Sequence, residues 1–208
     1  ANRARVRADC SGIFPIVIAG NGLLQRTGDT NYPFRQDSNF WYLTGLDEPN
    51  LVLVIDEADE YIIVPPQTFA QAAFNGKIDN SKLNGRSGIQ HFIAQKEGFA
   101  RLRSTLARSK RFSTCLPSPL FDKWHGMYTS PARRRSLTKL RRMAPGCAVQ
   151  DIRPVLARLR CIKQPPELAA IREAIDITCS TIDELRTSAS LAAFRHEYEL
   201  EAAITTGF

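Results

Sequence analysis

Residues able to carry out catalysis are few in this sequence and lie far apart. The three histidines, His91, His125 and His196, lie in helical contexts and have no partner two or four positions further on that would complete a pair of metal ligands. The motifs Gly-x-Ser-x-Gly and His-Glu-x-x-His and a glycine-rich phosphate loop are also absent. We therefore predict no catalytic residue and no metal ligand here, and interpret the histidines as surface or core-edge residues.

The densest collection of polar and aromatic side chains lies between Asn31 and Asp56. Its first half places Arg35 and Asp37 among five large aromatic residues, a composition typical of a half-buried segment. Its second half places Glu48 in a turn that leads into an apolar run. Because a half-buried arginine needs carboxylate partners, we predict a structural charge network of Arg35, Asp37 and Glu48.

The elements that must position these residues begin with strands. Apolar runs rich in β-branched residues predict them at residues 12–19, 51–55, 61–64 and 111–116. The second and third runs are separated by five polar residues, so we expect them to form an antiparallel hairpin. Residues 20–30 and 76–88 are rich in glycine and polar side chains and are predicted to be loops.

Helices are predicted between and after the later strands. Amphipathic spacing indicates one or two helices over residues 89–110, broken near Gly98, and another helix over residues 131–142. Residues 120–128 are predicted to be a short helix whose aromatic side faces the core. Alternating strands and helices indicate an α/β layer structure.

The character of the chain becomes mainly helical beyond Ala148. Asp151 can cap a first helix, and the break at Gln164-Pro165-Pro166 precedes a second, whose apolar residues recur every three or four positions. A third helix follows from His196 to the end. The apolar stripe from Leu168 to Leu185 must find cover, so we predict a dimer or a swapped packing of these helices.

The composition is that of a globular protein with a basic excess. The net charge is +7, and much of it comes from residues 101–111 and 133–142. No motif of nucleic-acid recognition accompanies these residues, so a solvated helix face or a contact with an acidic partner is favoured over nucleic-acid binding. No apolar run has the roughly 20 residues of a membrane helix, no signal peptide opens the sequence, and the five scattered cysteines indicate reduced thiols. We therefore expect a cytoplasmic protein with no membrane partner.

The stretch around residue 40 is similar to a known family pattern. The matching residues are Asp29, Tyr32 to Gln36, Ser38 to Phe40, Tyr42 to Gly45, and Glu48-Pro49 before the strand. This string resembles the N-terminal domain of the aminopeptidase P and prolidase family, the proline-specific hydrolases of the creatinase or "pita-bread" group of metallopeptidases. Leu159 to Leu168 and His196 to Leu200 also resemble the family, at the junction of its two domains and at the second helix of its catalytic domain.

The resemblance implies a fold and a division into domains. It implies an α/β domain over residues 1–150, with a mixed sheet of about six strands and helices on both faces, as in ribonuclease H. Residues 151–208 would be the linker and the first helices of a truncated catalytic domain. The family's five metal ligands lie further along its chains and match nothing here, so we expect this fragment to be inactive. The intact enzyme would use two divalent metal ions, with manganese expected.

The resemblance also implies two residues that would contact substrate in the intact enzyme. Asp29 would pair with the free α-amino group of a peptide, although an ordinary loop Asx-turn explains it equally well. Phe74, in Phe74-Asn75-Gly76, stands where the family has a tryptophan that lines a neighbouring subunit's site; a plain core or loop phenylalanine is the alternative. The remaining motif residues are interpreted as structural: Tyr32, Arg35, Asp37, Tyr42, Gly45, Glu48 and Pro49.

The activity implied by the resemblance is removal of an N-terminal residue that precedes proline in short peptides. The N-terminal domain would restrict access to the active site and support a homo-oligomer. Two alternatives stay open: a non-enzymatic family member that binds protein or nucleic acid, and a prolidase that acts on dipeptides.

Overall fold

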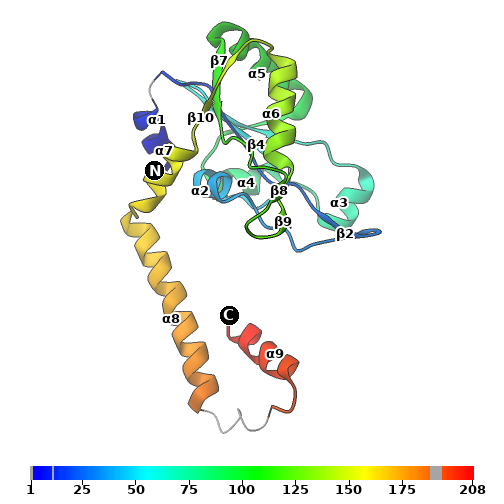
Figure 1. Cartoon of the computed structure of the whole chain (residues 1–208), viewed down its shortest axis with the longest axis vertical. Coiled ribbons are helices and arrows are strands. Elements are labelled where there is room, and N and C mark those ends of the chain that lie inside the picture. The colour runs from blue at the N-terminus through cyan, green and yellow to red at the C-terminus, as the bar shows by residue number, and fades with distance from the viewer. Residues whose placement is uncertain (1, 11, 188–193) are drawn as a thin grey trace. The chain divides into compact units, whose positions relative to one another are not determined.

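The computed structural model of this chain describes residues 2–10, 12–187 and 194–208 (Figure 1). These residues belong to two compact units, Ala1–Leu159 and Arg160–Phe208. The first unit is an α/β domain and the second consists of helices. Whether the second unit begins a catalytic domain stays a prediction. Within the described ranges, no helix combines the length and the apolar character that crossing a membrane requires.

A six-stranded mixed sheet forms the centre of the first unit. Its strands, in spatial order, are β10 (Ala148–Asp151), β7 (Arg111–Thr114), β1 (Ile16–Ala19), β4 (Val52–Ile55), β5 (Glu60–Val64) and β6 (His91–Ala94). The central pairs β1–β4 and β4–β5 are antiparallel, whereas β10–β7, β7–β1 and β5–β6 are parallel. The predicted hairpin and the predicted mixed sheet are therefore confirmed.

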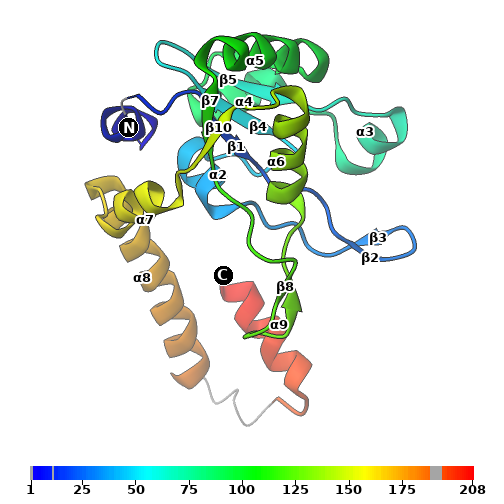
Figure 2. The same cartoon turned by 45° about the horizontal axis from the view of Figure 1, so that its top comes forward.

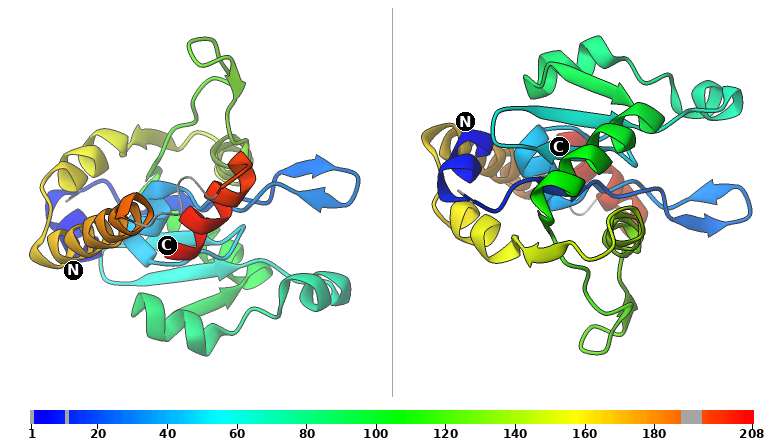
Figure 3. Two further views of the ribbon diagram at one scale, coloured as in Figure 1. Left: turned by 90° about the horizontal axis from the view of Figure 1, so that it is seen from below. Right: turned by 90° about the horizontal axis from the view of Figure 1, so that it is seen from above.

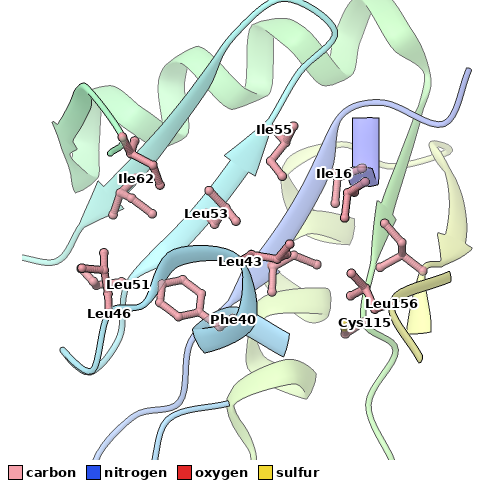
Figure 4. Packing of buried hydrophobic residues seen from close by; sticks show 14 of the residues in the cluster. Ile16, Phe40, Leu43, Leu46, Leu51, Leu53, Ile55, Ile62, Cys115 and Leu156 are labelled. Atoms are coloured by element: carbon pink, nitrogen blue, oxygen red, sulfur yellow. The ribbon is translucent and has the colours of Figure 1, made fainter. Parts of the chain in front are cut away.

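One face of the sheet packs on four helices, as Figure 4 shows for the centre of this cluster. The helices are α1 (Asn2–Asp9), α2 (Ser38–Thr44), α4 (Asn80–Ser87) and α7 (Arg153–Cys161). Alternation along the strands points Ile16, Leu53 and Ile62 to this face, where Phe40 of α2 and Leu156 of α7 complete the cluster. All five side chains are buried.

The other face of the sheet packs on α5 (Gln95–Ser109) and α6 (Ala132–Met143). Here the alternate strand residues Val17, Val54 and Ile63 meet Leu102 of α5 and Leu140 of α6. The fold is thus a three-layer α/β sandwich with helices on both faces, as predicted, and the views in Figures 1 and 2 show the two helical layers.

Two hairpins project from this unit in different directions, as both views in Figure 3 show. The first, β2 (Gln25–Thr27) with β3 (Thr30–Asn31), occupies a stretch predicted to be a loop. The second, β8 (Phe121–Asp122) with β9 (Met127–Tyr128), replaces the helix predicted over residues 120–128. The aromatic spacing was compatible with a helix, but Phe121 and Tyr128 pair across the two strands, with ring centroids 5.2 Å apart. Trp124 at the tip is 90% exposed, not turned to the core.

Local capping explains further helices that the predictions missed. The basic opening of the chain forms α1, and the glycine-rich stretch after residue 66 contains α3 (Phe69–Asn75) and α4. A capping box between Thr68 and Gln71 starts α3, and Asp79 caps α4. The last sheet strand, β10, was also missed because only Val149 in it is a strongly apolar β-branched residue.

The region from residue 89 to 110 differs from the predicted broken helix in two ways. Its first part is strand β6, so His91 lies in a strand rather than a helix. Helix α5 then passes through Gly98 without a break. A β-carbon at Gly98 would lie 2.8 Å from Cγ1 of Ile63, so close packing of α5 on the sheet explains this glycine.

The second unit consists of α8 (Pro165–Thr187) and α9 (Glu197–Gly207). Both were predicted, with prolines at the start of α8. The hydroxyl of Thr181 donates a hydrogen bond to the carbonyl of Gly207, at 3.0 Å, and so joins the two helices. Ile175 and Ile182 on the predicted stripe of α8 are 53% and 56% exposed.

Candidate functional site

Helix α2 is held at its N-terminus by the carboxylate of Asp37. Oδ1 accepts hydrogen bonds from the backbone N–H groups of Asn39 and Phe40, at 2.9 and 3.1 Å. Oδ2 accepts two from the guanidinium of Arg133 on α6, at 2.9 and 2.6 Å. The Asp37 side chain is only 7% exposed, so both oxygens of a buried carboxylate are satisfied by one helix and one arginine.

Gln36 fixes the chain just before this cap. Its Oε1 accepts hydrogen bonds from the backbone N–H groups of Asn21 and Asp37, at 2.7 and 2.9 Å, and its Nε2 donates to the Glu48 carbonyl at 3.0 Å. One buried amide thereby joins three segments: the end of β1, the start of α2 and the turn before β4. A β-carbon at Gly20 would lie 3.0 Å from Oε1 of Gln36, which explains the glycine there.

Helix α2 ends at Gly45, whose φ of 66° lies in the left-handed region. Arg86 of α4 donates to the Gly45 carbonyl at 3.1 Å and pairs with Oε1 of Glu48 at 2.8 Å. The predicted charge network is therefore wrong in its arginine: Asp37 pairs with Arg133 and Glu48 with Arg86. Arg35 itself is exposed and forms no salt bridge within the described part of the chain.

The other predicted motif residues differ in exposure. The hydroxyl of Tyr42 accepts a hydrogen bond from Arg5 of α1, at 3.0 Å, and donates to the Leu159 carbonyl at 3.4 Å. Pro49 lies in a half-buried turn, followed by Asn50 with a positive φ. Tyr32 is 54% exposed at the base of the β2–β3 hairpin. Tyr42 thus forms hydrogen bonds within the unit, whereas Tyr32 is largely exposed beside the hairpin.

Asp29 occupies the tip of the β2–β3 hairpin. It follows Gly28 in the two-residue turn, where Gly28 has a φ of 46°. The side chain is exposed. A carboxylate in this position is available to pair with a cationic group from outside the unit, such as an α-amino group.

Phe74 lies near the end of α3 and is 89% exposed. Phe69 at the start of the same helix is 92% exposed, so α3 carries two aromatic rings that the first unit does not cover. Phe74 is therefore not a core phenylalanine. Its exposure agrees both with an ordinary surface position and with a position that faces a substrate. Figures 1, 2 and 3 show the β2–β3 hairpin and α3 projecting from the same end of the unit.

The chemistry that Asp29 and Phe74 can supply at this end is ligand recognition. Asp29 offers a negative charge and Phe74 an apolar ring. Among the described residues, no three His, Cys, Asp or Glu side chains gather in a way that would hold a metal ion.

The arginines that hold the motif were missed because they lie far away in the sequence. Arg133 is 96 residues from Asp37, and Arg86 is 38 residues from Glu48. Arg133 stood out only as one member of a basic helix. No local pattern in the sequence pairs Asp37 with Arg133 rather than with the neighbouring Arg35.

The Cys115 thiol, which contacts Asn39 of α2, is strongly desolvated. Burial raises the pKa of the Cys115 thiol to about 11, against an opposing effect of the Arg133 charge. Its sulfur accepts a hydrogen bond from the amide of Asn39 at 3.5 Å. Cys115 is therefore a neutral core residue rather than a nucleophile.

Comparison with known proteins places this geometry in a family. Residues 1–112 match the family described as aminopeptidase P, N-terminal domain. The Xaa-Pro aminopeptidase of Haemophilus influenzae is 29% identical over 190 residues, covering 88% of this chain and 40% of that protein. The Xaa-Pro aminopeptidase of Escherichia coli is 28% identical over 196 residues, covering 86% of this chain and 41% of that protein.

A solved structure agrees with these relatives. Aminopeptidase P from Escherichia coli, with the inhibitor Pro-Leu, matches with a TM-score of 0.72 and 26% identity. The match covers 100% of this chain and 47% of the solved chain. This chain therefore spans less than half the length of the relatives it matches.

Proposed function

The chain belongs to the aminopeptidase P N-terminal domain family, and from this we propose that it is the N-terminal part of an Xaa-Pro aminopeptidase, a hydrolase that releases the residue preceding proline. The observation that carries the proposal is the family match over residues 1–112, continued at the level of fold through the whole chain. The relatives named above are Xaa-Pro aminopeptidases.

The role proposed for this part is substrate selection. Asp29 at the hairpin tip would pair with the free α-amino group of a short peptide, and Phe74 on α3 would supply an apolar wall, in its own or a neighbouring subunit's site. Both side chains are exposed, and the two elements that carry them, the β2–β3 hairpin and α3, project from one end of the unit (Figure 3), which supports this role. A bulky domain at the mouth of an active site would also restrict access to short or unfolded peptides.

The metal ions of the proposed enzyme would be held by residues outside this chain's described part. The described residues contain no cluster of suitable ligands, so we assign none of them to a metal. Two divalent ions, with manganese preferred, would activate water when bound in the intact enzyme. The residues of this chain would contribute binding and orientation of the peptide.

Oligomerisation and location belong to the same proposal. The exposed isoleucines of α8 need cover, and a homo-oligomer would supply it. Light scattering of the 208-residue chain at micromolar concentration should therefore give more than the monomer mass, and a monomer would contradict this part.

The scattered cysteines favour a cytoplasmic location.

The test is hydrolysis of Xaa-Pro peptides with added Mn²⁺, by the 208-residue chain and by the full-length product of its gene. We expect activity only in the full-length protein. There, Asp29→Asn should raise KM about three- to tenfold for peptides with a free amino terminus, since an exposed ion pair contributes about a kcal/mol. Phe74→Ala should raise KM similarly.

Matched controls lie on the same two elements. Arg26→Gln changes an exposed residue of the β2–β3 hairpin, and Phe69→Ala removes the other exposed ring of α3. Both should leave KM unchanged. If the full-length protein is inactive, the non-enzymatic binding module is the better reading, and if the short chain cleaves peptides, the chemistry lies within it. Faster cleavage of dipeptides than of longer peptides would favour a prolidase.

A further inference from the structure

A basic groove lies between α5 and α6, on the side of the sheet away from the motif helix α2. Its volume is about 770 Å³. The lining residues recur at helical spacing along both helices, so one face of α5 and one face of α6 line the groove. Its cationic residues are Lys96, Arg103, Arg134, Arg135, Lys139 and Arg142. We call this feature the α5–α6 groove.

The six cations of the groove have no carboxylate partners. None of them forms a salt bridge within the described ranges, and no aspartate or glutamate lines the groove there. The contrast with the arginines that hold the fold is clear. Arg133, Arg86 and Arg101 each pair with a carboxylate. Arg134 donates a hydrogen bond to the Ser118 carbonyl at 3.1 Å, but a carbonyl carries no net charge, so no carboxylate within the described ranges neutralises the positive charge of the groove.

The position of these cations works against the stability of α6. The first turn of α6 contains Arg133, Arg134 and Arg135 and no acidic residue. Cations are unfavourable at a helix N-terminus, which carries partial positive charge, and like charges four residues apart, such as Arg135 and Lys139, repel. Asp37 compensates Arg133, whereas Arg134 and Arg135 stay uncompensated. Such a local conflict is expected where a site is retained for binding.

The groove also has an apolar component. Phe99 and Met143 line it beside the cations, and both are half-buried. Lys139 covers the face of the Phe99 ring, with Nζ 3.3 Å from the ring centroid. The ring is therefore not free to stack on a nucleic-acid base, which removes the aromatic platform that single-strand binding uses. An occupant that combines carboxylates with an aliphatic side chain satisfies both parts of the lining.

We propose that the α5–α6 groove binds an acidic, partly apolar segment of a partner polypeptide, through charge pairs to its arginines and lysines and an aliphatic contact with Phe99 and Met143. Helix α6 has 12 residues. At about 1.5 Å per residue it is about 18 Å long, which an extended segment of roughly six residues spans. This inference does not depend on the peptidase proposal.

The test uses a fluorescent peptide rich in Glu and Asp with central leucines, and binding is followed by fluorescence anisotropy on the 208-residue chain. The groove variant is Arg134→Glu with Arg142→Glu. Its control is Arg108→Glu on α5 with Arg141→Glu on α6, which reverses two exposed charges outside the groove on the helices that line it. Both variants change the net charge equally, and thermal melts establish that both fold.

The proposal predicts that the groove variant binds the peptide at least about tenfold more weakly than the wild type, because charge-assisted contacts are lost. The control variant should stay within about twofold, since only long-range attraction changes. A peptide with serine in place of leucine should bind more weakly. The absence of binding, equal losses in the two variants, or equally tight binding of the serine peptide or of a single-stranded oligonucleotide of the same charge would overturn the proposal.

Discussion

Asp37 and Arg133 join the two faces of the sandwich at a single carboxylate. Asp37 caps α2, which packs on one face of the sheet, and Arg133 belongs to α6, which packs on the other. The shorter of the two bonds between them is 2.6 Å. Oδ1 of Asp37 caps the first turn of α2 while Oδ2 binds Arg133, so the family motif and the basic helix α6 are structurally coupled through one side chain.

This coupling predicts graded losses of stability. Asp37→Ala removes the helix cap and strands Arg133, so we expect a loss of about 3–5 kcal/mol in the free energy of unfolding. Asp37→Asn keeps the oxygen that caps α2 but replaces the oxygen that accepts from Arg133 with an NH2 group, so the charge and the Arg133 hydrogen bonds are lost, with an expected loss of about 1–3 kcal/mol. Urea denaturation measures both. As a control, Arg158→Ala breaks an exposed pair with Asp9 and should cost less than about 1 kcal/mol. Equal losses for the two Asp37 variants would contradict the dual role.

Two helical glycines should respond to alanine with opposite signs. Alanine is normally favoured over glycine in a helix by about 1 kcal/mol. Gly85→Ala in α4 meets nothing within 4 Å and should be stabilising by about that amount. Gly98→Ala places its β-carbon 2.8 Å from Ile63 and should destabilise by about 1–3 kcal/mol through overpacking. Thermal melts of the two variants decide the matter, and stabilisation by both would show that α5 can move away from the sheet.

The sheet was predictable because its signal is local. The runs at β1, β4 and β5 consist largely of β-branched residues, and alternation along them determines which side chains point to each helical layer. The β8–β9 hairpin was not predictable from spacing alone. Phe121 and Tyr128 lie seven positions apart, which fits two turns of a helix as well as a pair across a hairpin.

The partners within the site could be predicted only in part. That Asp37 and Glu48 need cations follows from their half-buried context, but the arginines that supply them are set by how α6 and α4 pack. Arg35, the nearest arginine, points to solvent instead. The exposure of Asp29 was predictable from its glycine-containing turn, whereas the exposure of Phe74 depends on α3 projecting from the unit.

The five cysteines should differ widely in reactivity. Burial raises the pKa of Cys115 to about 11, so roughly one part in a thousand is thiolate at pH 8. Burial also raises the pKa of Cys10. Cys161, at the end of α7, is exposed and should be alkylated by iodoacetamide well before either of them. Peptide mass spectrometry at timed intervals measures the order, with guanidinium-unfolded protein as the control in which the differences disappear. Labelling of Cys115 as fast as Cys161 in the folded protein would contradict the buried assignment.

Asp151 should make stability depend on pH in the acidic range. Burial raises the pKa of its carboxyl, but this is outweighed by hydrogen bonds from the Arg153 side chain and from the backbone N–H groups of Arg153 and Leu116, so the folded pKa lies below the ordinary value of 3.8. The unfolded state therefore binds the proton more tightly. The stabilising effect of the ionised Asp151 carboxylate is complete above about pH 5. It is lost as the pH falls through 4 toward the folded pKa.

The corresponding variant is Asp151→Asn, which keeps an oxygen able to accept the backbone hydrogen bonds of Arg153 and Leu116 and removes the charge. At pH 7 we expect it to be less stable than the wild type by about 1 kcal/mol. The difference should shrink as the pH falls toward 3, because the wild-type carboxyl becomes protonated. Arg153→Met should likewise be less stable than the wild type at pH 7, by a difference that shrinks toward pH 3, since the guanidinium is the carboxylate's main partner. Urea denaturation at pH 7 and pH 3 measures the effect, and a difference of the same size at both values would mean that the Asp151 charge does not stabilise the folded state.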